Sequence, residues 1–97
     1  MRPVVNQPSA AAAPLAEDEA AIVMPFGDLT VSEGRLVGWL KALGEPVSAG
    51  ETVAEIETDK ALVEIEAPAA GRLVAIEQPV GAVVPMGGRI GRIRRDG

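Results

Sequence analysis

The sequence predicts an all-β domain, and three observations carry this prediction. The 97-residue chain has 12 Val, 7 Leu and 6 Ile but only two aromatic residues, and β-branched aliphatic residues favour strands. From Ala21 onward, short apolar runs alternate with Gly or Pro about every 8 to 12 residues, which is typical of sandwiches and barrels. The second half of this region also repeats the first half.

The repeat aligns residues 34–57 with residues 71–94 at a constant offset of 37. Eight of the 24 aligned positions are identical, including the run Gly-Arg-Leu-Val that opens each copy. A short apolar segment ending in proline precedes each copy, at Pro25 and at Pro68. Because two copies are too few for a solenoid, we expect them to pack face to face as two four-stranded antiparallel sheets related by a pseudo-two-fold axis.

The apolar runs place the strands of this domain. We predict strands over residues 21–24, 35–40, 46–48, 52–57, 62–67, 71–76, 83–85 and 89–94. The leucines at 36, 40 and 43 have the spacing of a helix face, but the glycines at 34, 38 and 44 argue against a helix there.

Residues 1–20 differ from the rest in composition. They hold three prolines, four consecutive alanines and the acidic run Glu17-Asp18-Glu19, with no periodic apolar stripe that could bury a face. We therefore expect a flexible Ala/Pro-rich acidic arm over 1–20 and a domain over 21–95. A short helix over 10–16 is the alternative.

The composition excludes several classes of function. A chain without Cys and His offers no thiolate nucleophile, no catalytic imidazole and no Cys/His zinc site, and we expect neither catalytic residues nor a metal. The net charge of −5 repels phosphate backbones, so nucleic acid is not an expected partner. No apolar run approaches the roughly 20 residues that cross a bilayer. The first residues, MRPVV, lack the apolar core of a signal peptide, so we expect the cytoplasm.

Residues 53–68 predict a hairpin with an exposed tip. Strand alternation places Ile56 and Ile65 inward, and it places four glutamates outward, at 55, 57, 64 and 66. The connecting residues, Thr58 to Ala61, predict a tight turn in which an Asp side chain bonds its own backbone. Lys60, one of only two lysines, then stands at the tip, between the two repeats. A lysine on a turn is most often a solvated surface residue, so its position alone leaves its role open.

Around this lysine the chain resembles the lipoyl domains of the 2-oxo acid dehydrogenase complexes, within the wider biotinyl/lipoyl attachment family. The segment IETDKALVEI matches the lipoylation motif of the family, and EGRLVGWLKALGEPVSAGETVAEIE resembles the stretch before it. The resemblance covers about residues 21–95. It implies a flattened barrel, or barrel-sandwich hybrid, with lipoic acid joined through an amide to Lys60. It also implies that a lipoate ligase or lipoyl transferase reads Asp59 and Ala61.

The same fold carries biotin in other proteins, so the flanking residues have to decide the cofactor. Biotin carriers usually have Met on both sides of the lysine, whereas Asp59 and Ala61 flank Lys60 here. Lipoate is therefore the favoured cofactor. The biotin carboxyl carrier domain of a biotin-dependent carboxylase is the alternative, and an unmodified scaffold of this fold is the third possibility.

The resemblance implies a swinging-arm carrier that is not an enzyme by itself. Such a carrier, as part of a dihydrolipoyl acyltransferase component, moves acyl groups and reducing equivalents between a thiamin-diphosphate 2-oxo acid decarboxylase, an acyltransferase core and a dihydrolipoyl dehydrogenase. Partner recognition is implied for Glu57 and for the first loop, at Phe26, Gly27, Asp28 and Leu29. In that loop Gly-Asp-Leu replaces the Leu-Gly-Glu common in the family, which leaves open the complex served. The long arm leads us to expect a free-standing carrier rather than a piece of a larger acyltransferase.

Overall fold

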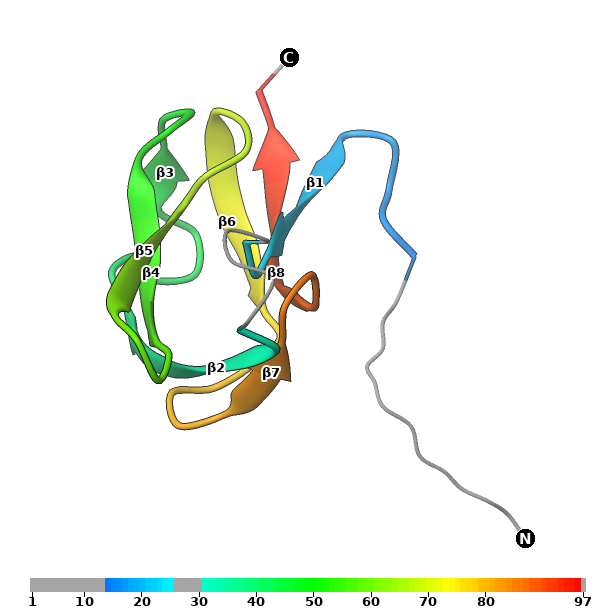
Figure 1. Cartoon of the computed structure of the whole chain (residues 1–97). Coiled ribbons are helices and arrows are strands. Elements are labelled where there is room, and N and C mark those ends of the chain that lie inside the picture. Colours follow the sequence, from blue (N-terminus) through cyan, green and yellow to red (C-terminus); the bar gives the residue numbers. More distant parts are fainter. Residues whose placement is uncertain (1–13, 26–30, 97) are drawn as a thin grey trace, which may run out of the picture.

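The computed structural model describes residues 14–25 and 31–96, and within them the chain forms strands and no helix (Figure 1). The strands are β1 (Glu19–Val23), β2 (Glu33–Trp39), β3 (Pro46–Val47), β4 (Thr52–Glu57), β5 (Leu62–Glu66), β6 (Gly71–Ile76), β7 (Val83–Pro85) and β8 (Arg89–Arg95). Each predicted strand is present, with bounds that differ by two residues or fewer. The all-β prediction is therefore confirmed, while the helix considered for 10–16 lies mostly outside the described residues.

The strands form two antiparallel four-stranded sheets that enclose one aliphatic core (Figure 1). One sheet has the order β1-β8-β6-β3, and the other has the order β5-β4-β2-β7. The largest fully buried side chains are Ile22, Met24, Leu36, Val53, Ile56, Leu73, Ile90 and Ile93. The repeated valines, leucines and isoleucines thus supply the inner faces of both sheets, as strand alternation requires.

The pseudo-two-fold relation is present in both the topology and the hydrogen bonds. A shift of 37 residues carries β2, β3 and β4 onto β6, β7 and β8, and so converts one sheet order into the other. The backbone N of Gly44 donates to Leu73 O at 2.7 Å, and the backbone N of Gly81 donates to Leu36 O at 2.7 Å. Both glycines have φ near +90° (88° and 97°), a conformation that a Cβ atom disfavours. The repeat is therefore a structural symmetry, as predicted.

The first strand begins at Glu19, two residues before the predicted start of the domain. Although Glu19 is acidic, its side chain is only 5% exposed. Its Oε1 accepts hydrogen bonds from Ala16 N and from Arg92 Nη1, both at 3.0 Å. The neighbouring carboxylate of Asp18 lies 3.3 Å from Arg94 Nε. Two of the three acidic residues assigned to the arm are thus bonded to β8, because arginines more than 70 positions away compensate their charge.

The matched core positions give a direct test of the symmetry. Ile56 and Ile93 are both fully buried at equivalent places in β4 and β8. We expect Ile56→Ala and Ile93→Ala each to cost about 2 to 5 kcal/mol of unfolding free energy, because both leave a cavity in the same core. Chemical denaturation of the two variants side by side measures this. A large loss for one isoleucine with almost none for the other would contradict equivalent halves.

The buried Glu19 gives a pH prediction. The Ala16 amide first, and then the Arg92 guanidinium, hold the pKa of Glu19 below its ordinary value of about 4.5. The charged form therefore stabilises the fold above about pH 4.5, and this stabilisation is lost as the pH falls through the lower pKa of the folded state. We expect Glu19→Gln to be less stable than the parent at pH 7 and to lose less stability on acidification. Thermal unfolding from pH 7 to pH 3 measures this.

Glu17→Gln provides the control for the pH series, because the exposed Glu17 side chain makes no ion pair with any other residue of 14–25 and 31–96. This variant should follow the pH profile of the parent. Parallel profiles for the parent and for Glu19→Gln would show that the buried ion pair does not contribute to the acid sensitivity.

Candidate functional site

Lys60 lies at the tip of the turn that joins β4 to β5, and its side chain is exposed. Within the part of the chain that the structure describes, its Nζ makes no ion pair. The other lysine differs in this respect, because Lys41 Nζ lies 2.8 Å from Glu51 Oε2 and its side chain is only 21% exposed. The hydrogen bond to Glu51 also raises the pKa of Lys41. Of the two lysines, only Lys60 presents an amine without an ion-pair partner among the residues that the structure describes.

Thr58 makes the hydrogen bonds that shape the turn. Its backbone N donates to Ala61 O at 2.9 Å, and its Oγ1 accepts bonds from the backbone N of Lys60 and of Ala61, each at 3.1 Å. Asp59 makes none of these bonds, so the expected Asp-to-backbone bond is wrong. A β-branched hydroxyl residue at the end of β4 can perform the same local capping, and this was the signal in the sequence. The result is that Lys60 is held at a defined tip.

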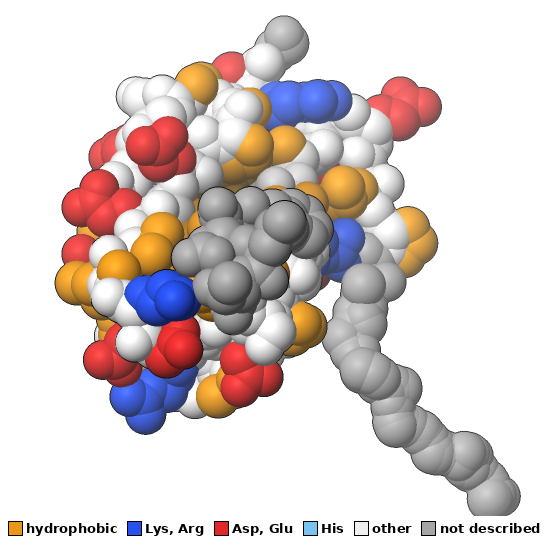
Figure 2. Space-filling view, in the orientation of Figure 1, with side chains coloured by type: hydrophobic (Ala, Val, Ile, Leu, Met, Phe, Trp, Pro, Cys, Tyr) orange, Lys and Arg blue, Asp and Glu red, His pale blue; other side chains and the backbone are white. Residues whose placement is uncertain are grey.

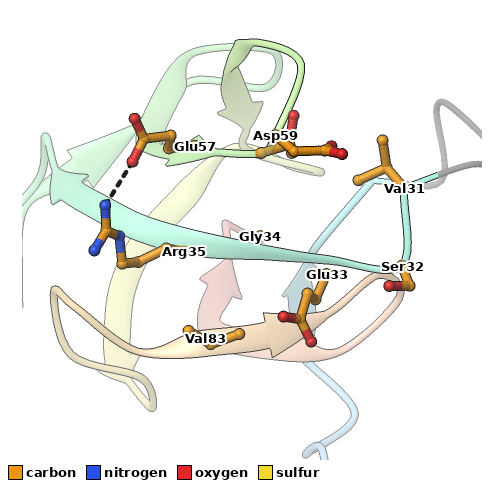
Figure 3. A pocket seen from close by; sticks show the side chains of 9 residues that line it. Val31, Ser32, Glu33, Gly34, Arg35, Glu57, Asp59 and Val83 are labelled. Carbon is orange, nitrogen blue, oxygen red and sulfur yellow. Dashed lines mark hydrogen bonds and ion pairs between the residues drawn. The ribbon is translucent and has the colours of Figure 1, made fainter.

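A hollow of about 440 Å³ lies beside the turn (Figure 3). Its lining residues are Val31, Ser32, Glu33, Gly34, Arg35, Glu57, Thr58, Asp59 and Val83. Arg35 Nη2 lies 2.7 Å from Glu57 Oε1 across the β2–β4 pair. Because both side chains are more than half exposed, this ion pair orients them more than it stabilises the fold. The carboxylates of Glu33, Glu57 and Asp59, which come from β2, from the end of β4 and from the turn, thus line this hollow (Figure 3).

The predicted site residues are only partly brought together. Asp59, Lys60 and Ala61 share the turn, and Glu57 is at the end of the strand that leads into it. The loop residues named for partner recognition, Phe26 to Leu29, lie outside the described residues. Arg35 was not predicted as a site residue, because its pairing with Glu57 depends on the β2–β4 register.

Residues 14–25 and 31–96 contain no group of three or more acidic side chains arranged to hold a metal ion. They also contain no helix with the length and apolar character needed to cross a membrane.

Residues 21–93 match the biotin/lipoyl family, described as biotin-requiring enzyme, and the chain belongs to this family of attachment domains. Among curated relatives, the dihydrolipoyllysine-residue acetyltransferase component of the pyruvate dehydrogenase complex of Mycobacterium tuberculosis is 41% identical over 81 residues. The alignment covers 84% of this chain and 15% of that protein. The chain therefore spans about one seventh of the length of this relative.

Solved structures of a lipoyl domain and of a carboxylase have the same fold. The lipoyl domain of the 2-oxoglutarate dehydrogenase complex from Azotobacter vinelandii has a TM-score of 0.64 and 30% identity, over 80% of this chain and 100% of that one. A single-chain, multi-domain long-chain acyl-CoA carboxylase has a TM-score of 0.73 and 26% identity, over 91% of this chain and 8% of that one. The flattened-barrel prediction is confirmed, and the fold alone does not choose between lipoate and biotin.

The role of Thr58 can be tested with a variant of nearly equal shape. Thr58→Val removes the acceptor for the Lys60 and Ala61 amides, so we expect faster hydrogen exchange at both amides and a loss of about 1 kcal/mol in unfolding free energy. Thr58→Ser keeps the hydroxyl and should behave like the parent. Amide exchange followed by NMR measures the change, and unaltered protection in Thr58→Val would rule out this capping role.

Proposed function

We propose that Lys60 carries lipoate and that the domain acts as the swinging-arm carrier of a 2-oxo acid dehydrogenase complex. The observation that carries the proposal is the Lys60 amine itself, which is exposed at the β4–β5 tip and makes no ion pair with residues 14–25 or 31–96. The membership of the chain in the biotin/lipoyl family supports the proposal. The relatives in pyruvate dehydrogenase complexes and the lipoyl-domain fold match support lipoate in particular.

The local residues also favour lipoate over biotin. Asp59 and Ala61 flank Lys60, both exposed, and neither is the methionine usual in biotin carriers. We propose that the enzyme that attaches lipoate reads these two side chains. Biotin remains the second candidate, because the carboxylase match covers more of this chain than the lipoyl-domain match.

The residues around Lys60 fit a covalently tethered group. An amide between Nζ and the lipoyl carboxyl group removes the lysine charge and leaves the side chain free to extend into solvent. The bound group would supply the dithiolane that this chain, which lacks cysteine, does not have. The protein's own contribution is positional, because Thr58 fixes the turn and the paired strands β4 and β5 hold it at the end of the barrel.

The same proposal identifies the partners by their reactions. A thiamin-diphosphate decarboxylase would load the arm, an acyltransferase core would unload it, and a dihydrolipoyl dehydrogenase would reoxidise it. Tethering makes each handover effectively intramolecular, so the local concentration of the arm is far above that of a free cofactor. We also propose that residues ahead of Glu19 serve as a linker, because their Ala/Pro-rich composition suits an extended tether.

Substitution of the lysine tests the proposed function. Lys60→Arg keeps the charge and the turn but removes the amine that can be acylated, so we expect a folded domain that gains no mass with lipoate ligase, lipoate and ATP. The parent and Lys41→Arg should each gain one lipoyl increment. Intact mass spectrometry reads all three proteins and distinguishes lipoyl from biotinyl addition. Lipoate retained on Lys60→Arg would exclude Lys60 as the attachment site.

A further inference from the structure

The internal repeat allows the outer faces of the two sheets to be compared position by position. The two sheets share one scaffold, so a systematic difference between their outward residues is not required by the fold. At equivalent outward positions, β4 has Glu55 and Glu57 where β8 has Arg92 and Arg94. The β4 side of the barrel is therefore acidic where the β8 side is basic.

The difference extends over the strands of the two sheets. Strands β5, β4, β2 and β7 hold five acidic residues and one basic residue, a net charge of −4, whereas β1, β8, β6 and β3 hold one acidic and five basic residues, a net charge of +4. Figure 2 shows acidic side chains gathered along the side of the molecule formed by β4 and β5. Acylation of Lys60 would make this side more acidic still.

Several arginines on the basic side form ion pairs or hydrogen bonds with other residues of the domain. Arg92 contacts Glu19 at 3.0 Å and Glu77 at 3.1 Å, and Arg94 contacts Asp18 at 3.3 Å. Arg72 donates to the backbone O of Gly44 at 2.8 Å. These arginines therefore have structural partners that explain their presence.

The acidic side has few such partners in the described part of the chain. Glu57 pairs with Arg35, and Glu64 accepts a hydrogen bond from Thr52 Oγ1 at 3.2 Å, but Glu55, Glu64 and Glu66 make no ion pair. Moreover, Glu55 lies directly opposite Glu64 in the β4–β5 register. Two like charges opposite each other destabilise a sheet. The same place in the other sheet pairs Arg92 with Ala21, which avoids this cost.

Exposed apolar side chains accompany these charges. One cross-strand row of the sheet reads Leu62, Glu57, Arg35, Val83, from β5 through β4 and β2 to β7. Leu62 is 62% exposed and Val83 is 58% exposed. Apolar contacts beside charged groups are the usual make-up of a protein–protein interface.

We infer that the outer face of the β5-β4-β2-β7 sheet is the surface on which the ligase that attaches lipoate docks, through a basic surface beside the entrance to its active site. This inference rests on the proposed function of Lys60. Lys60 stands at the edge of the face, two residues before Leu62, so an enzyme that encloses its Nζ covers the adjoining ends of β4 and β5. The unpaired glutamates then serve to attract and orient that enzyme.

The experiment compares two double variants that remove the same charge from opposite ends of the barrel. Glu55→Gln/Glu64→Gln neutralises the opposed pair, and Glu17→Gln/Asp96→Gln neutralises two exposed carboxylates beside the β1–β8 ends. Purified lipoate ligase, lipoate and ATP are the probe, and initial rates are measured below the KM for the domain. Two salt concentrations, about 20 mM and about 500 mM, vary the screening of surface charge.

We expect kcat/KM of Glu55→Gln/Glu64→Gln to fall about fivefold or more at low salt, with kcat little changed and the difference lost at high salt. The control double variant should stay within about twofold of the parent under both conditions. The denaturation midpoint of Glu55→Gln/Glu64→Gln should equal or exceed that of the parent, because a repulsive pair has been removed. A slower reaction therefore cannot be ascribed to unfolding.

Equal kcat/KM for the two double variants at low salt would overturn the docking assignment and leave Lys60 as the modified lysine. Equal ligation rates together with slower acylation of the lipoylated Glu55→Gln/Glu64→Gln by a decarboxylase would also overturn it, and would assign the face to that enzyme. A parent chain that gains no lipoyl group would overturn the proposed function and this inference together.

Discussion

The whole structure depends on the packing of one aliphatic layer between two sheets that have the same internal pattern. Leu36 and Ile56 from one half meet Leu73 and Ile93 from the other, and all four are fully buried. Because the chain has no cysteine, no disulfide reinforces this layer. The hairpin that carries Lys60 extends directly from this layer, through β4 and β5. The position of the tip therefore depends on the packing of the core.

A two-fold scaffold presents one special lysine because the symmetry is broken where the chain enters and leaves the barrel. In the β4–β5 turn, the backbone N of Thr58 donates to Ala61 O. At the equivalent place in the other half, Arg95 N donates to Asp18 O, so the same bond joins two separate segments instead of closing a turn. The scaffold offers this position twice, but a continuous tip is formed only once.

The sequence predicted the parts of the structure that depend on local pattern. Alternation and the Gly/Pro spacing predicted the strands, because these patterns are local in the sequence. The motif around Lys60 located the tip for the same reason. The repeat predicted the two sheets, because equivalent segments form equivalent strands. Thr58 was not predicted as the turn-capping residue because Asp59, in the same turn, also has a side-chain oxygen that can accept a backbone hydrogen bond.

The features that the sequence did not predict arise between residues far apart in the chain. Burial of Glu19 depends on Arg92, and the Arg35–Glu57 pair depends on the β2–β4 register. The opposition of Glu55 and Glu64 also requires the exact pairing of β4 with β5. Which charged residues lie opposite each other depends on the strand register, so the sequence alone does not identify these partners.

The bond between Arg95 and Asp18 has a topological consequence. It brings the point where the chain enters the barrel next to the point where it leaves, at the end of the molecule away from the β4–β5 turn (Figure 1). A domain with adjacent ends can be inserted into a longer polypeptide, or duplicated in tandem, without rearrangement of its strands. The entry and exit points of the barrel therefore lie together, at the end opposite the turn that carries Lys60.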